Sequence, residues 1–206
     1  MGSHERLDVF YALMKRLIDI IVSGLLIVGL APFGLITAVL IKLDTKGPVF
    51  YRQRRCGLHG VEFWMYKLRT MVVNADDLKK TLRNEVDGPM FKVTHDPRIT
   101  RVGRWLRKWS LDEFPQLFNV FRGEMSLVGP RPLAAEEMTK NPEWRELRLT
   151  VQPGMTGLWQ IKARHTKKFE DWVKYDSEYV RNRSLMLDIR LLFMTVGAVL
   201  GRKGAE

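Results

Sequence analysis

The sequence has little sulfur or imidazole: one cysteine, Cys56, and four histidines among 206 residues. A lone cysteine cannot form an internal disulfide, which is typical of a protein from a reducing compartment. The single thiol and the scattered histidines also exclude a thiolate metal cluster and a histidine zinc site. Internal repeats and low-complexity tracts are absent as well, and the length suits one catalytic domain with a short appendage.

Acidic residues are scarce relative to basic ones, 23 against 34, so the formal net charge is +11. Such a charge favours anionic partners, whether nucleic acid, an acidic lipid surface or phosphorylated small molecules. The sequence has no recognition helix, RNP motif or zinc-finger motif, so we expect no nucleic-acid partner.

Charge is missing altogether from residues 20–41. As a straight helix this run would be roughly 33 Å long, close to the hydrocarbon thickness of about 30 Å. Pro32 removes an amide donor and clashes with the preceding turn, which predicts a break. Basic residues flank both ends, among them Lys15 and Lys42, and the positive-inside tendency draws both ends to the cytoplasm. Two topologies remain open: a re-entrant hairpin broken at Pro32 and an ordinary kinked transmembrane helix.

Short elements follow the apolar run. Residues 47–51 and 61–66 predict a small β-hairpin, and residues 75–84 predict a polar helix. Residues 102–109 place basic and tryptophan side chains at helical spacing, which suits a membrane interface. Residues 185–200 are strongly apolar and predict either an interfacial helix or a core helix.

Two adjacent carboxylates, Asp112 and Glu113, precede an apolar run at 114–121. One interpretation is purely structural: Ser110 and Glu113 fit a capping box, and Asp112 is a favourable charge at a helix start. The other is catalytic. A carboxylate beside Arg107 stays ionised, and its oxygens can attack phosphorus or bind a metal.

Two further segments have fixed backbones. Residues 126–133 project Arg131 from a turn stiffened by glycine and proline, where it could bind phosphate or pair with a carboxylate. Residues 151–161 form a glycine-punctuated loop followed by a strand-like run, and such loops cradle phosphates or simply turn the chain.

Taken in order, these segments resemble the bacterial sugar transferase family, the monotopic polyprenyl-phosphate phosphoglycosyl transferases of the undecaprenyl-phosphate hexose-1-phosphate transferase type. The resemblance runs from Lys15 to Ala205. It rests on the proline-broken apolar run and on these motifs: Gly47-Pro48-Val49-Phe50, Lys67-Leu68-Arg69-Thr70-Met71, Ser110-Leu111-Asp112-Glu113, Ser126 to Pro132, and Pro153-Gly154-Met155-Thr156-Gly157-Leu158-Trp159-Gln160.

The resemblance implies an α+β, mainly helical fold with a re-entrant membrane helix hairpin, a small β-hairpin and interfacial amphipathic helices. Residues 1–4 resemble an expression-tag remnant, residues 5–44 would form the lead-in and membrane helix, and residues 45–206 the cytoplasmic catalytic domain with a C-terminal interfacial helix. The protein would lie at the bacterial inner membrane with both termini cytoplasmic. Similar hexose-1-phosphate transferases carry extra N-terminal helices, so this chain is either a short member or the catalytic core of a longer enzyme.

The resemblance also implies the reaction. Asp112 would attack the β-phosphate of a UDP-sugar, such as UDP-galactose or UDP-glucose, and release UMP. Undecaprenyl phosphate would then take the sugar 1-phosphate from the enzyme, which is the first membrane step of exopolysaccharide, O-antigen or glycoprotein glycan synthesis. Mg²⁺ would be held by Asp112 and Glu113. The candidate substrate-binding residues are Lys67, Arg69, Arg107, Arg131, Arg164 and Asp176.

Contacts with membrane lipids are expected, and a homodimer is compatible with these expectations. The rival hypothesis is a non-enzymatic membrane-anchored scaffold, which would need the apolar run and the basic surface but not Asp112.

Overall fold

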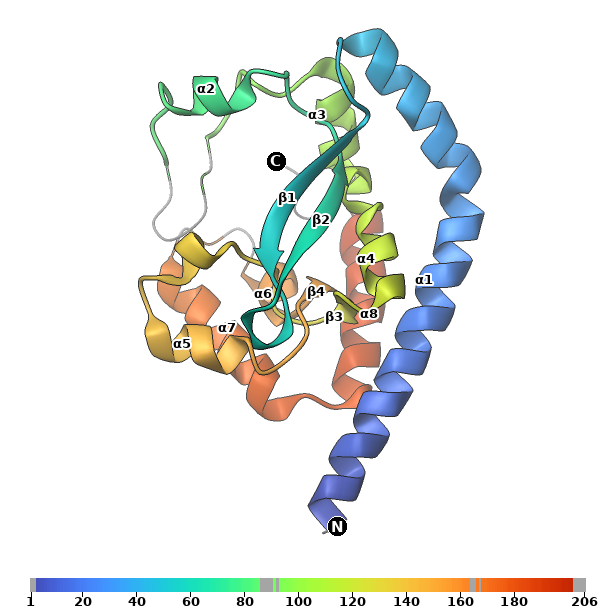
Figure 1. Ribbon diagram of the computed structural model, residues 1–206, viewed down its shortest axis with the longest axis vertical. Helices are drawn as coiled ribbons and strands as arrows, with labels where there is room; N and C mark the ends of the chain where they lie inside the picture. Colours follow the sequence, from blue (N-terminus) through green and yellow to red (C-terminus); the bar gives the residue numbers. More distant parts are fainter. Residues whose placement is uncertain (1–2, 86–90, 92, 164–165, 167, 202–206) are drawn as a thin grey trace.

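The computed structural model describes residues 3–85, 91, 93–163, 166 and 168–201. Most of these residues are helical, which confirms the mainly helical α+β class (Figure 1). The α-helices are α1 (Ser3–Asp44), α2 (Ala75–Lys79), α3 (Arg101–Lys108), α4 (Gln116–Arg122), α5 (Pro142–Arg148), α6 (Leu158–Lys162), α7 (Phe169–Asn182) and α8 (Leu185–Leu200). The 3₁₀ turns are η1 (Leu58–Gly60), η2 (Leu111–Glu113) and η3 (Ala135–Met138), and the strands are β1 (Phe50–Cys56), β2 (Glu62–Leu68), β3 (Ser126–Val128) and β4 (Gly154–Thr156).

Helix α1 runs without interruption through Pro32, so the predicted break is not seen as an end of the helix. Instead α1 follows an arc along one side of the molecule (Figure 1). A proline removes one amide donor, and a helix can absorb that loss by bending when neighbouring elements hold it on both sides of the bend. Phe33 lies against Trp105 of α3, with ring centroids 6.1 Å apart, and Gly34 lies against Phe114.

The outer side of α1 is apolar and exposed. Its stretch from Asp8 to Asp44 is the one helix, among the described residues, long and apolar enough to cross a membrane. The large exposed apolar side chains on it are Val9, Phe10, Leu13, Leu17, Ile20, Ile21, Leu25, Leu26, Val28, Leu35, Ile36, Val39, Leu40 and Leu43. An exposed apolar patch of this extent is typical of a site that interacts with a protein or a membrane.

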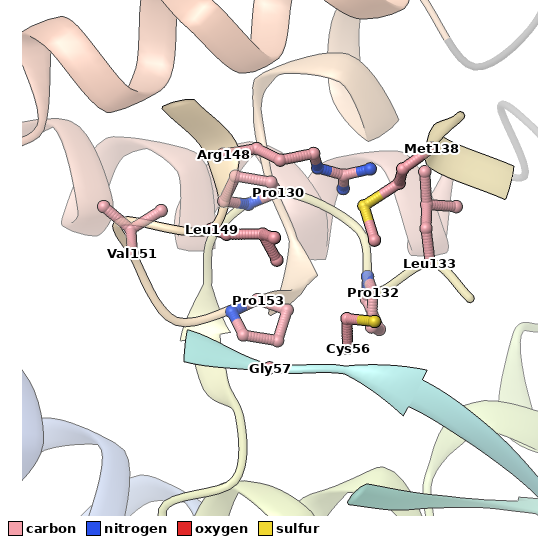
Figure 2. Close-up of a pocket in the computed structure, with 10 residues that line it drawn as sticks. All are labelled: Cys56, Gly57, Pro130, Pro132, Leu133, Met138, Arg148, Leu149, Val151 and Pro153. Carbon is pink, nitrogen blue, oxygen red and sulfur yellow. The ribbon is translucent and has the colours of Figure 1, made fainter. Parts of the chain in front are cut away.

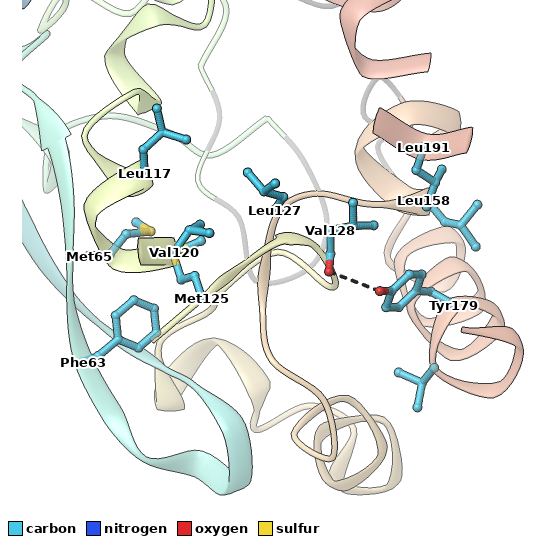
Figure 3. Packing of buried hydrophobic residues seen from close by; sticks show 11 residues of the cluster. Phe63, Met65, Leu117, Val120, Met125, Leu127, Val128, Leu158, Tyr179 and Leu191 are labelled. Carbon is cyan, nitrogen blue, oxygen red and sulfur yellow. Dashed lines mark hydrogen bonds between the residues drawn. The ribbon is translucent and has the colours of Figure 1, made fainter. Parts of the chain in front are cut away.

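Strands β1 and β2 pair antiparallel, with Phe50 opposite Leu68 and Cys56 opposite Glu62, which confirms the predicted hairpin. Its inner face carries Phe63 and Met65, which pack on the main core. Figure 3 shows this core between the hairpin, α4, and the C-terminal helices. Strands β3 and β4 form a second, parallel pair that the sequence did not predict.

Helix α8 confirms the predicted helix at 185–200, and one of its faces belongs to the core. Asp188 and Leu191 are buried against the domain, whereas Met186, Phe193 and Val196 are exposed. One helix therefore contributes to the core with one face and leaves an apolar face outside.

Three local predictions are wrong. Ser110 does not cap a helix, because it has a left-handed backbone (φ 53°) and its side chain makes no cap hydrogen bond. The strand-like run after residue 157 is helix α6, whose residues Leu158 and Trp159 are buried on two different core clusters. The polar helix at 75–84 is shorter than predicted, since α2 ends at Lys79.

Candidate active site

Asp112 and Glu113 lie in the single turn η2, between α3 and α4. Ser110, between α3 and η2, has a left-handed backbone, and Pro115 is the residue that precedes α4. Non-glycine residues rarely adopt this conformation, and where they do they often serve a local functional geometry. The dyad is thus held on a tight turn and not, as predicted, in the first turn of a long apolar helix.

Glu113 forms ion pairs with two basic side chains from distant parts of the sequence. Its Oε1 accepts from Lys67 Nζ on β2 at 3.0 Å and from an Arg131 guanidinium nitrogen at 3.1 Å. These side chains are only partly buried, with 19% of Lys67, 29% of Arg131 and 23% of Glu113 exposed. The predicted cluster of Lys67, Arg131 and the dyad is therefore assembled, and it is open to solvent.

Asp112 is more buried than Glu113, with 9% of the residue exposed. Burial raises the pKa of the Asp112 carboxyl, and the adjacent Glu113 charge raises it further, while Lys67 and Arg107 lower it. Arg107 is held in place by Thr70, whose Oγ1 accepts from Arg107 Nε at 2.9 Å. A buried carboxylate kept near several cations is poorly hydrated and can attack an electrophile.

Arg131 lies on a turn whose backbone is fixed by β3 and β4. Gly129 donates its N–H to the Thr156 carbonyl and Gly154 donates to the Pro130 carbonyl, both at 2.8 Å. A Cβ on Gly154 would lie 2.0 Å from the Gly129 nitrogen. This close backbone approach requires glycine, and it explains the glycines in both predicted loops.

Asp176 contacts the Arg131 turn only indirectly. Its carboxylate lies 3.4 Å from an Arg148 guanidinium nitrogen, and the same guanidinium donates to the Arg131 carbonyl. Burial raises the pKa of Asp176 to about 6, even though Arg148 lowers it. Trp144 and Trp172 enclose this pair in the second core cluster.

Arg69 is buried and makes contacts unlike those expected of a phosphate ligand. Its guanidinium donates to the carbonyls of Ile41, Thr45 and Lys46. It therefore satisfies carbonyl groups at the C-terminal end of α1 and just beyond, a favourable place for a cation. Arg164 lies outside the described residues.

A small cavity adjoins the Arg131 turn. Figure 2 shows it between Cys56 at the end of β1 and Arg148 of α5, with Pro130 and Pro132 on its wall. Its volume of about 10 Å³ is room for no more than one water molecule. The cavity therefore does not accommodate a nucleotide-sugar.

Two residues that support the site, Thr70 and Arg148, were not among the predicted site residues. Thr70 positions Arg107, and Arg148 holds the Arg131 backbone, in each case across more than fifteen residues of sequence. The Lys67 to Met71 segment contained Thr70, but nothing in its residue types pointed to a contact with α3.

Cations around two adjacent carboxylates, beside an exposed apolar helix, suit a transferase that handles phosphates at a lipid surface. Residues 10–202 match the family described as "Bacterial sugar transferase", and the chain belongs to this family.

The chain is similar to an undecaprenyl-phosphate galactose phosphotransferase of Salmonella typhimurium, with 42% identity over 93% of this chain and 41% of that protein. It is also 41% identical to a UDP-glucose:undecaprenyl-phosphate glucose-1-phosphate transferase of Xanthomonas campestris, over 96% of this chain and 41% of that protein. An exopolysaccharide production protein, ExoY, of Rhizobium meliloti is 39% identical over 93% of this chain and 87% of that protein. The chain thus spans about two-fifths of the length of the first two relatives and most of the third.

Proposed function

We propose that this chain transfers a sugar 1-phosphate from a UDP-sugar to undecaprenyl phosphate and releases UMP. The observation that carries the proposal is the buried Asp112, which adjoins a Glu113 already paired with Lys67 and Arg131. The names of the relatives support a hexose donor, because they include galactose and glucose phosphotransferases.

In the first step an Asp112 carboxylate oxygen attacks the β-phosphorus of the UDP-sugar. The new oxygen–phosphorus bond forms as the bond from that phosphorus to the α,β-bridging oxygen breaks, and UMP leaves with that electron pair. The product is a sugar phosphate esterified to Asp112. Arg131, Lys67 and Arg107 offset the repulsion between the anionic nucleophile and the anionic diphosphate.

In the second step a phosphate oxygen of undecaprenyl phosphate attacks the same phosphorus, and Asp112 leaves as a carboxylate. The attacking phosphate is already anionic, so no proton has to be removed. Separating the two steps lets one open site handle two anionic substrates in turn.

A magnesium ion fits the donor set. Among the described residues no three histidine, cysteine or acidic side chains gather in one place, and the described part of the site offers the two dyad carboxylates. Mg²⁺ is typically bound by one or two carboxylates together with substrate phosphates and water. We therefore propose Asp112 and Glu113 as its ligands, where the ion would neutralise phosphate charge.

We also propose that α1 enters and leaves the membrane by the cytoplasmic leaflet of the bacterial inner membrane. Both ends of α1 bind the same domain: Lys15 contacts Asp188 of α8, and near the other end Asp44 accepts from the Val102 N–H of α3. As one straight helix its 42 residues would be about 63 Å long, twice the hydrocarbon thickness. An arc that lies in one leaflet, with its apolar side toward lipid, agrees with the length of α1 and with the attachment of both its ends to one domain.

The activity is tested by mass spectrometry of the intact protein, quenched while it turns over UDP-galactose or UDP-glucose. We expect a mass increase of one hexose phosphate on Asp112 and a stoichiometric release of UMP. Asp112→Asn should show neither, with UMP release lower by about 10⁴-fold, while the matched variant Asp171→Asn, in the first turn of α7, should form the adduct normally. A membrane scaffold would predict no adduct from any donor.

The topology is tested with single cysteines placed at Asp8 and at Lys46, since the natural Cys56 is buried. Both cysteines should react with a membrane-impermeant maleimide only when the cytoplasmic face is accessible. Labelling of the two cysteines from opposite faces of the membrane would instead mean that α1 is a transmembrane helix.

A further inference from the structure

A cluster of polar side chains lies where α1 meets α7 and α8, away from the dyad. It consists of Tyr11 and Lys15 of α1, Tyr179 of α7 and Asp188 of α8. Lys15 and Asp188 form an ion pair of 2.6 Å whose side chains are 16% and 8% exposed. The mechanism proposed above uses none of these residues.

The cluster binds the backbone of β3. Lys15 Nζ donates to the Val128 carbonyl at 2.9 Å, and the same carbonyl accepts from the Tyr179 hydroxyl at 3.1 Å (Figure 3). One turn further along α1, the Asp19 carboxylate accepts from the Leu127 N–H at 2.9 Å. Residues four apart on a helix share a face, so one face of α1 holds two consecutive residues of β3.

Strand β3 leads directly into the turn that carries Arg131. Val128 is followed by Gly129 and Pro130, and the hydrogen bonds to β4 and the proline ring leave little freedom between the strand and the arginine. A displacement of β3 is therefore transmitted to the Arg131 guanidinium, which pairs with Glu113.

We propose that Lys15 and Asp19 are positioning residues for Arg131, so that the seating of the membrane helix sets the geometry of the dyad. This inference rests on the proposed function. In it α1 has two roles, because it anchors the chain in lipid and holds the strand from which a phosphate-binding arginine projects. A catalytic group displaced by a fraction of an ångström loses much of its effect while the fold stays intact.

The neighbouring residue Arg16 provides a matched control. It has the same charge and lies on the same helix, but it donates to the carbonyls of Val120 and Phe121 at the end of α4, both at 2.7 Å. Loss of Arg16 weakens the attachment of α1 to the domain without touching β3.

The experiment is the burst of UMP release by Lys15→Met, Lys15→Arg and Arg16→Gln in nanodiscs, with UDP-sugar in excess over enzyme and without undecaprenyl phosphate, so that each active enzyme releases one UMP. The rate constant reports the geometry of the intact site, whereas the amplitude reports how much enzyme is folded. We expect Lys15→Met to lower the rate constant about tenfold at an unchanged amplitude per folded enzyme. Lys15→Arg should recover most of the rate, and Arg16→Gln should stay within about twofold of the wild type.

Equal rate constants in Lys15→Met and the wild type would overturn the inference, and so would equal losses in Lys15→Met and Arg16→Gln, because these mean anchoring alone. If Lys15→Met does not fold, the same rate constant is measured for Tyr179→Phe. This variant removes the hydroxyl that donates to the Val128 carbonyl and keeps the ring in the core. A rate constant lowered severalfold supports the proposal, and an unchanged one overturns it. Absence of UMP release by the wild type from every donor would instead sink the proposed function.

Discussion

The Arg131 turn lies between two charge clusters that are built differently. On one side, the dyad sets two adjacent carboxylates among Lys67, Arg107 and Arg131, and the cluster is partly exposed. On the other side, Asp176 pairs with Arg148 alone, and these side chains are only 2% and 4% exposed. The cluster proposed to bind phosphates is open and its charges share partners, whereas the pair in the core is enclosed, as expected for a structural ion pair.

Removing a cation from the enclosed pair should produce the largest effect. Arg148→Met leaves Asp176 buried without its partner, and breaking a buried pair in this way costs about 3–5 kcal/mol. Thermal unfolding in detergent should show a marked fall in the melting temperature. Arg145→Met, on the exposed side of the same helix, is the control and should barely change it.

Removing a cation from the open cluster should affect the reaction instead of the fold. Arg131→Met leaves Lys67 paired with Glu113 and removes one of the cations proposed to face the donor diphosphate. We expect kcat/KM for the UDP-sugar to fall about 10²- to 10³-fold with a melting temperature close to the wild type. A large loss of stability without a selective loss of activity would contradict the distinction between the two clusters.

The enclosed pair should also impose a pH dependence on stability. The folded pKa of Asp176 is about 6 against an ordinary 3.8, so the folded state binds more protons than the unfolded state between these values. Stability from this group is therefore present at low pH and is lost as pH rises through 6. Because Asp176→Asn does not titrate, the stability of the wild type relative to this variant should fall by up to about 3 kcal/mol between pH 4 and 7. Unfolding curves across that range provide the measurement, and a constant difference would contradict the raised pKa.

The sequence predicted the parts of the molecule that depend on local patterns. Two short runs of strand-forming residues around a glycine turn predicted the hairpin, the long uncharged run predicted a long apolar helix, and the adjacent carboxylates located the centre of the candidate site. The glycines of the two loops were visible as turn signals, but their pairing as β3 and β4 depends on a contact between residues 129 and 154. Such a contact has no local signature.

The less successful predictions concern residues whose partners lie far away in the sequence. Arg69 stood in a family motif, yet its guanidinium binds carbonyls at residues 41–46. Ser110 fitted a capping box by spacing, but in the turn between α3 and η2 it has a left-handed conformation that a cap does not use. Pro32 predicted a break, but the domain packed along α1 supports a continuous arc.

A line of small buried polar side chains runs along the inner side of the apolar helix α1. Asp19, Ser23 and Thr37 are at most 2% exposed, and the two hydroxyls donate to carbonyls one turn back within the helix itself. Turning α1 by a single residue would rotate its faces by about 100° and carry the Asp19 carboxylate toward hydrocarbon, where it is strongly disfavoured. The buried polar residues therefore fix the rotation of α1 about its own axis, and the same apolar side of the helix always faces away from the domain.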